Sequence, residues 1–209
     1  MVELELQGEI NMNSFDLFGY HLLNQFAGHH YSIDLIMSFF AQYALELYAC
    51  LFIIAWFTLP KPETDRRHAL VIMGLSGILA LIINLVISNI WFRPRPFVTL
   101  PKGTFTQLIP HSVDASFPSD HASGSFGFAA GSWNKAPFWV SWSFTLLAIL
   151  VAIARVYTGV HWPTDVLASV IIGVVSAKVI WLINPIFRPL TNLADRIFRY
   201  GKYAKGNSN

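Results

Sequence analysis

The chain has 209 residues, of which 54% are hydrophobic and only 12% are charged, about half the roughly 25% that is usual in soluble domains. Its mean hydropathy is +0.49 and its net charge is +2, which excludes an intrinsically disordered chain. The basic residues are too few to form a face that could neutralise a row of phosphates. We therefore expect no nucleic-acid partner. The single cysteine, Cys50, cannot form an internal disulfide and leaves the redox compartment open.

The first thirty residues differ from the rest of the chain. Residues 1–13 are acidic and contain neither a basic region nor an apolar run, which argues against a cleavable signal peptide. Residues 15–27 carry apolar side chains at helical spacing but are too few to cross a bilayer. They predict an amphipathic helix lying in the membrane interface, within an N-terminal segment of residues 1–30.

Four later runs are long and apolar enough to cross the roughly 30 Å hydrocarbon layer of a bilayer. Between the second and third lies a shorter segment, residues 119–133, whose Gly, Ala and Ser residues predict a helix packed inside the bundle. We therefore expect an all-α integral membrane bundle of about five spans, forming one domain over residues 1–209 with a basic tail at 187–209. The four long runs are residues 34–60, 69–92, 138–154 and 166–186, the last with Lys178 near its end.

The distribution of Lys and Arg predicts the orientation of this bundle. Segments 60–68, 134–137 and 187–209 together carry nine of these residues, whereas the segments on the other side carry four. Because cytoplasmic loops are enriched in Lys and Arg, the C-terminus is predicted to be cytoplasmic. The two polar loops 93–121 and 155–165 then share the outer face of the membrane.

The first of these loops opens with Arg93 and Arg95 in the stretch FRPRPF. Arginine presents a rigid, permanently charged fork that matches the oxygens of a phosphate group. Prolines between and after the two arginines stiffen the backbone that carries them. Taken alone, the pair is equally typical of positive residues that follow a membrane helix.

The same loop ends in Pro118-Ser119-Asp120-His121, followed by small residues. Ser119 is a candidate N-cap, and the N–H groups of a helix N-terminus attract anions. His121, two positions beyond the cap, could donate a proton to a departing oxygen. The alternative interpretation is an ordinary capped helix.

The second loop contains His161 and Asp165, on either side of Pro163, which suits the first turn of the last span. A carboxylate one turn into the helix can accept a hydrogen bond from one ring nitrogen, which leaves the other as a nucleophile or base. An isolated pair of this kind is more often structural. Two histidines and several arginines predicted on one face favour phosphoryl-transfer chemistry.

A metal site is the competing interpretation of this set. The candidate ligand spacings match no zinc signature such as His-Glu-x-x-His. Nearby arginines would also repel a divalent cation, so we expect no metal and no other cofactor. The candidate ligands are His111, His121, His161, Asp114, Asp120 and Asp165.

Together the three segments resemble the type-2 phosphatidic acid phosphatase superfamily of membrane lipid phosphatases, whose signature is Lys-x6-Arg-Pro, Pro-Ser-Gly-His and Ser-Arg-x5-His-x3-Asp. The matching positions run from Arg95-Pro96, through Pro118 to His121, to Arg155, His161 and Asp165. The resemblance implies that His161 attacks phosphorus to form a phosphohistidine. It further implies that Asp165 orients His161 and that His121 protonates the leaving group. The implied phosphate-binding residues are Arg95, Arg155 and Ser119.

Three positions depart from the signature. Ser88 occupies the place of the lysine, and we hypothesise that Arg93 supplies the missing cation. Asp120 replaces the glycine, which together with Ser88 indicates altered phosphate contacts, and Ala154 replaces the serine.

The wider stretches FRPRPF, LIPHSVDASFPSDHASG and HWPTDVLAS resemble the bacitracin-resistance branch of bacterial undecaprenyl diphosphate phosphatases. That branch implies hydrolysis of this polyprenyl diphosphate to the monophosphate, recycling of the cell-wall carrier lipid, and bacitracin resistance. Partners beyond the lipid substrate and the bilayer are not expected. Another lipid substrate, such as phosphatidylglycerophosphate or phosphatidic acid, is the alternative, and a small membrane transporter is a more distant one.

Glu46 lies near the middle of the first predicted span, and the signature does not explain it. A charge inside a span is costly and is normally paired or functional. We expect it either to be held by Asn84 or Asn89 or to contact substrate or a proton path.

Overall fold

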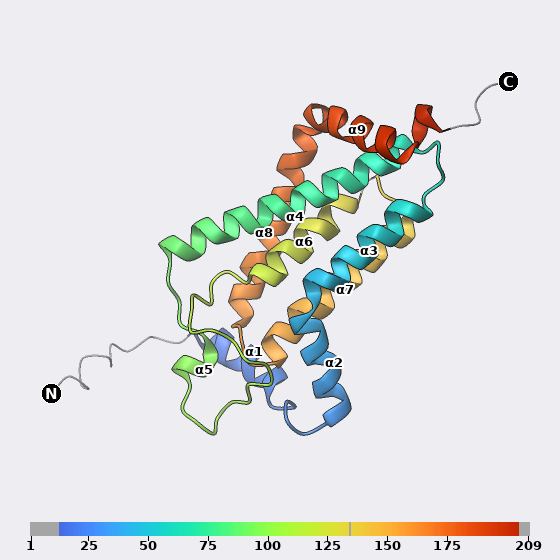
Figure 1. Cartoon of the computed structure of the whole chain (residues 1–209). Helices are drawn as coiled ribbons and strands as arrows, with labels where there is room; N and C mark the ends of the chain where they lie inside the picture. The colour runs from blue at the N-terminus through green and yellow to red at the C-terminus, as the bar shows by residue number, and fades with distance from the viewer. Residues whose placement is uncertain (1–12, 134, 205–209) are drawn as a thin grey trace.

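The computed structural model describes residues 13–133 and 135–204, and this part of the chain is helical without any strand (Figure 1). Residues 1–12 and 205–209, which include part of the acidic start and Lys205, lie outside the described residues. The helices are α1 Ser14–Asn24, α2 Tyr31–Gln42, α3 Ala44–Thr58, α4 Thr64–Ile90, α5 Pro96–Thr99, α6 Asp120–Ser132, α7 Phe138–Tyr157, α8 Pro163–Leu182 and α9 Arg188–Phe198.

Helices α4, α7 and α8 are each long and apolar enough to cross a membrane, and they surround the shorter α6 (Figure 1). Glycines let α6 approach its neighbours closely. A Cβ atom on Gly127 would lie 2.8 Å from the carbonyl oxygen of Ser76 on α4, and one on Gly173 of α8 would lie 2.6 Å from Gly127 N. Backbone therefore meets backbone, which confirms that residues 119–133 form a helix packed within the bundle.

The first predicted span is broken. In place of one helix over residues 34–60, α2 and α3 meet at an angle of 72° on either side of Tyr43. The sequence Gln42-Tyr43-Ala44 contains no proline or glycine. The Ala41 carbonyl, which a continuous helix would bond internally, instead accepts a hydrogen bond of 3.0 Å from Arg155 Nη1 of α7. A side chain that inserts into the helical hydrogen-bond ladder is a known cause of such kinks.

Helix α1 forms at the predicted place, and its pattern of burial is reversed relative to a soluble helix. Its polar residues Asp16 and Asn24 are buried against α7 and α8. Its opposite face exposes the large apolar side chains of Phe15, Phe18 and Leu22, and Phe26 just after the helix is exposed too. This distribution suits a helix that rests in a membrane interface.

The tail also forms a helix, α9, where the sequence predicted only a basic segment. Thr191 and Asp195 are buried on its inner side. The Thr191 hydroxyl lies 2.7 Å from His68 Nδ1 of α4, so its polar residues face the protein. Its outer side exposes Leu190, Leu193 and Ile197.

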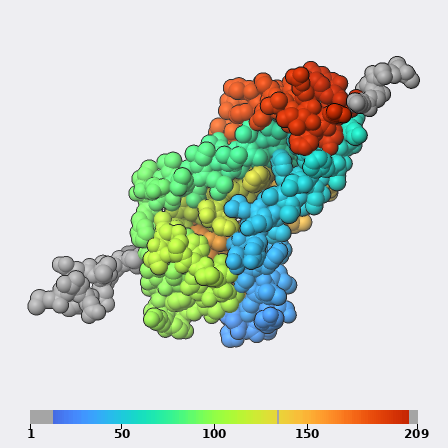
Figure 2. Space-filling view, viewed as in Figure 1, coloured from blue at the N-terminus to red at the C-terminus, as the bar shows by residue number. Residues whose placement is uncertain are grey.

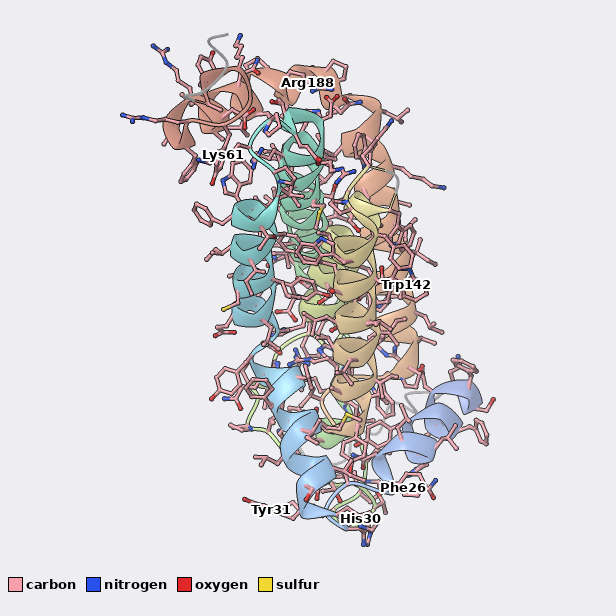
Figure 3. The ribbon with its side chains drawn as sticks, turned by 90° about the vertical axis from the view of Figure 1, so that its right-hand side faces the viewer. Phe26, His30, Tyr31, Lys61, Trp142 and Arg188 are labelled. Carbon is pink, nitrogen blue, oxygen red and sulfur yellow. The ribbon has the colours of Figure 1, made fainter. Side chains whose placement is uncertain are left out.

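Helix α9 lies at one end of the bundle, and α1, α2 and α5 lie at the other (Figure 1). Figure 3 places Lys61 and Arg188 at one end and Phe26, His30 and Tyr31 at the other. The polar loops predicted to share a face do meet, because Arg95 Nη1 donates a 2.9 Å hydrogen bond to the Val160 carbonyl. In Figure 2 the green to yellow-green surface of the loop before α6 lies beside the blue surface of α2, at the end opposite α9.

Candidate active site

His161 lies between α7 and α8, and its side chain is fully buried. Its Nδ1 is 2.8 Å from the Ser116 carbonyl oxygen, which can only accept a hydrogen bond. Its Nε2 lies 3.1 Å from Arg95 Nη1 and 3.1 Å from Arg155 Nη2, and guanidinium groups can only donate. The network therefore assigns the proton to Nδ1 and leaves the Nε2 lone pair facing two cations.

Both arginines are held by groups on several elements. Arg95 is 4% exposed, and its Nε donates to Asp114 Oδ1 at 2.7 Å. Arg155 is 2% exposed and lies between the Ala41 carbonyl and His111 Nε2, which is 3.0 Å from Arg155 Nη2. The Arg155 Nε is buried without a hydrogen-bond partner in the described part of the chain.

The surroundings of His161 disfavour the imidazolium form. Burial lowers the pKa of His161 to about 4, and the charges of Arg155 and Arg95 act in the same direction. Burial and the same two arginines also hold the pKa of His111 below its usual value. His161 therefore remains neutral, and can act as a nucleophile, well below neutral pH.

Asp165 is near His161 as predicted, but their contact is long. The distance from His161 Nδ1 to Asp165 Oδ2 is 3.5 Å, whereas the Ser116 carbonyl is much closer to the same nitrogen. The Ser116 hydroxyl donates a short hydrogen bond to Asp165 Oδ2, and Trp162 N donates to the same oxygen at 2.9 Å. Ser116 thus links the carboxylate to the histidine. Sequence reasoning missed it, because a serine 45 positions from His161 carries no signal of its own.

Arg93 contacts two carboxylates in this structure, and these contacts give no support to our hypothesis that it replaces the signature lysine. Its Nη1 donates to Asp165 Oδ1 at 2.6 Å, and its Nη2 donates to Asp16 Oδ2 at 2.6 Å. Its terminal nitrogens are therefore committed to two carboxylates. A partly buried guanidinium is more stable when it is paired with carboxylates than when it is left without a negative partner, which accounts for the position of Arg93.

The N-terminus of α6 is capped as predicted. Ser119 is fully buried, and its hydroxyl accepts from Ala122 N at 3.5 Å. Asp120 differs from the prediction that it contacts phosphate. Its Oδ1 accepts from His121 N at 2.7 Å and from His121 Nδ1 at 2.9 Å. The Asp120 carboxylate therefore binds both the backbone N–H and the ring Nδ1–H of His121. This contact fixes the ring of His121 and leaves its Nε2 available.

No cluster of three or more His, Cys, Asp or Glu residues suited to a metal ion occurs within residues 13–133 and 135–204. The site instead gathers arginines and histidines, which are phosphate-binding groups. Comparison with known proteins agrees with this composition. A sequence profile described as the PAP2 superfamily matches residues 69–188.

The chain belongs to the PAP2 superfamily. It is 34% identical over 171 residues to undecaprenyl-diphosphatase BcrC of Bacillus subtilis (strain 168), covering 81% of this chain and 85% of the relative. It is 31% identical to an undecaprenyl-diphosphatase of Sulfolobus acidocaldarius, covering 78% and 73% of the two chains.

Solved structures share this fold at lower sequence identity. LpxE of Aquifex aeolicus aligns with a TM-score of 0.67 and 23% identity, over 81% of this chain and 96% of that one. The PAP2-type phosphatidylglycerolphosphate phosphatase of Bacillus subtilis aligns with a TM-score of 0.59 and 20% identity, over 83% and 88%. The chain is thus a multi-pass membrane protein with the PAP2 bundle.

The position of the missing PAP2 lysine lines a cavity of about 550 Å³ between α4 and the 114–120 loop. Ser88 borders it, and its hydroxyl donates to the Leu85 carbonyl at 3.0 Å. Asn84, Arg95 and Asp120 border the same cavity. The cavity therefore extends to Arg95. At the Ser88 position it is lined by a hydroxyl, where the PAP2 signature has a cation.

Neither predicted partner holds Glu46 in this structure. It occupies the first turn of α3, beside the break at Tyr43, and its side chain is exposed. Asn84 bonds instead to Ser123 and Pro118, and Asn89 bonds to the Leu85 carbonyl. A carboxylate in this position interacts favourably with the N-terminal end of the α3 dipole.

Proposed function

We propose that this protein hydrolyses undecaprenyl diphosphate to undecaprenyl phosphate and inorganic phosphate. The observation that carries the proposal is the unprotonated His161 Nε2, which faces the guanidinium groups of Arg95 and Arg155 at 3.1 Å each. The undecaprenyl-diphosphatase relatives support the choice of substrate. This activity would recycle the cell-wall carrier lipid and confer bacitracin resistance.

The reaction proceeds in two steps. His161 Nε2 attacks the terminal phosphorus, forming an N–P bond while the bond to the bridging oxygen breaks. His121 gives a proton to that oxygen, which departs with undecaprenyl phosphate. Water, deprotonated by His121, then attacks the phosphohistidine and releases inorganic phosphate.

Two groups of residues support these steps. Arg95 and Arg155 stabilise negative charge on the transferred phosphoryl oxygens, and Ser119 at the start of α6 adds hydrogen-bonding capacity. The Ser116 carbonyl holds the Nδ1 proton of His161 and thereby keeps Nε2 basic. No step requires a metal ion, and we propose that the enzyme is metal-independent.

The test measures phosphate release from undecaprenyl diphosphate in detergent by the wild-type protein and by His161→Ala, each with and without a strong chelator. We expect chelator-insensitive turnover by the wild type and its loss, by at least about 10³-fold, in His161→Ala. Acid-labile labelling from terminally radiolabelled substrate should appear only with an intact His161. Full activity of His161→Ala would refute the mechanism, and abolition by the chelator with recovery on one metal would refute metal independence.

Substrate choice requires a separate comparison. Turnover on undecaprenyl diphosphate should exceed that on phosphatidylglycerophosphate and phosphatidic acid, because the long polyprenyl tail can remain among apolar helices while its head reaches the site. If the enzyme turned over a glycerolipid faster, the proposed phosphatase chemistry would stand, but undecaprenyl diphosphate would no longer be the proposed substrate.

We further propose that the active site faces the outside of the cytoplasmic membrane and that α9 lies on the cytoplasmic side. In a Cys50→Ser background, Val113→Cys reports on the site end and Lys202→Cys on the α9 end, since both positions are exposed. A membrane-impermeant maleimide applied to intact cells should label only Val113→Cys. Labelling of Lys202→Cys alone would reverse the orientation.

A further inference from the structure

We propose that Asp16, on the interfacial helix α1, is a positioning residue that orients the catalytic His161 through Arg93 and Asp165. The proposal rests on the phosphatase function proposed above. It assigns a role to the N-terminal helix, which lies outside the part of the chain that the PAP2 profile matches.

The first link joins α1 to the loop after α4. Asp16 is 1% exposed, and its Oδ2 accepts from Arg93 Nη2 at 2.6 Å. Its Oδ1 accepts from Thr164 N at 2.8 Å, and Thr164 Oγ1 donates to Oδ2 at 2.7 Å. Both carboxylate oxygens are thus bound, one of them by a cation, so Asp16 fixes Arg93 relative to the start of α8.

The second link joins Arg93 to the catalytic pair. Arg93 Nη1 donates to Asp165 Oδ1 at 2.6 Å, while the other oxygen of Asp165 accepts from Ser116 and Trp162 N. The two Asp165 oxygens are therefore held from opposite sides. Ser116 also accepts a hydrogen bond from His161 Nδ1 through its carbonyl oxygen. A displacement of Asp165 would therefore move Ser116, and through Ser116 it would move the ring of His161.

The backbone of α1 is placed to make this contact. A Cβ atom on Gly19 would lie 2.9 Å from Pro163 Cγ, so α1 can approach the N-terminus of α8 this closely only with glycine there. Tyr20 packs on Trp162 with ring centroids 5.4 Å apart. Arg93 also stacks toward the Trp162 ring, at 5.6 Å from its centroid. Packing and charge therefore hold α1 in a single register against the site.

Asp16 does not touch the phosphate-facing side of His161, so its removal should lower kcat and leave KM nearly unchanged. Misplacement of a reacting group by about 1 Å can cost on the order of 100-fold in rate, and we expect Asp16→Asn to lower kcat about tenfold. The matched control is Asp34→Asn. Asp34 is also a carboxylate near this end, but it bonds to Gly28 N and the Tyr157 hydroxyl, outside the Arg93 network. We expect its kcat to stay within about twofold of the wild type.

A double-mutant cycle distinguishes positioning from general destabilisation. If Asp16 acts through Arg93, Asp16→Asn adds no further loss of kcat to Arg93→Gln, because the path is already broken. Independent, multiplicative losses of kcat would overturn the proposal, as would an Asp16→Asn protein with wild-type kcat.

A second variant covers the case in which Asp16→Asn does not fold. Thr164→Val keeps the side-chain shape and removes the hydroxyl that bonds to both Asp16 and Arg93. We expect about a threefold loss of kcat with unchanged KM, and unchanged kcat would count against the network. All assays use the lipid phosphate that the wild type hydrolyses best, so a wrong substrate assignment would leave the Asp16 test intact.

Discussion

Helices α1 and α9 lie at opposite ends of the bundle and share an unusual distribution of side chains. Each buries polar residues against the protein and exposes apolar residues to the surroundings. The buried residues of α1 lead to the active site, since Asp16 bonds to Arg93 and Arg93 bonds to Asp165. Those of α9 lead to α4, where Thr191 bonds to His68. The same surface pattern therefore supports catalysis at one end and stability at the other.

Arg155 and Arg67 express this difference most directly, because both are almost fully buried arginines. Arg155 faces His161, with its Nη2 lying 3.1 Å from His161 Nε2. Arg67 donates to the carbonyls of Leu59, Pro60 and Lys61 and stacks 3.9 Å from the centroid of the Tyr200 ring. Arg67 thus joins α4 to the α3–α4 loop and Tyr200 at the α9 end, whereas Arg155 lies against the nucleophile that we propose.

The largest expected effect tests the catalytic end. Arg155→Lys keeps the charge but loses the fork that reaches the Ala41 carbonyl, His111 and phosphate together. We expect kcat/KM to fall about 100-fold or more, with the thermal midpoint lowered by a few degrees. Steady-state kinetics and a thermal melt measure both quantities. Wild-type kcat/KM in this variant would remove Arg155 from the proposed phosphate site.

The second effect tests the opposite end. Arg67→Ala leaves three carbonyls without their donor, which costs about 3 kcal/mol in the free energy of unfolding. Because Arg67 is far along the bundle from His161, kcat per folded molecule should not change. Denaturation in detergent and active-site titration measure the two separately. A loss of kcat without a loss of stability would show that the two ends are not independent.

The third effect concerns the link between Asp165 and His161. Ser116→Ala removes the hydroxyl bond to Asp165 but keeps the carbonyl that accepts from His161 Nδ1. We expect kcat to fall about tenfold with little change in KM. Ser32→Ala, at an exposed position of α2 away from this network, is the control and should retain wild-type kinetics.

The smallest effect is a pH dependence at the catalytic end. The neutral form of His161 is the nucleophile, so the acid limb of kcat/KM that reports this group should lie near pH 4 instead of near 6.5. The unfolded chain binds a proton at this histidine between those values while the folded protein does not. Its contribution to stability is therefore complete above about pH 6.5 and is lost as the pH falls toward 4. An acid limb of kcat/KM near pH 6.5 would contradict this assignment.

Much of the fold was predictable because membrane helices are specified locally. Apolar length identified α4, α7 and α8, and small residues identified α6 as an inner helix. The proximity of Arg155 to His161 followed from motif spacing within a short segment. The kink at Tyr43 was not predictable, since it depends on Arg155, which lies 114 positions from Ala41.

By itself, the sequence determined a membrane bundle with phosphate-type chemistry on two loops, because hydrophobic length and motif spacing need no knowledge of distant partners. Only the tertiary structure decided what each charge contacts. Arg93, which the sequence suggested as a phosphate ligand, contacts Asp16 and Asp165. The Ser116 carbonyl accepts a hydrogen bond from His161 Nδ1. A buried ion binds whichever opposite charge the packing brings within reach, and that choice is set by chain segments far apart in sequence.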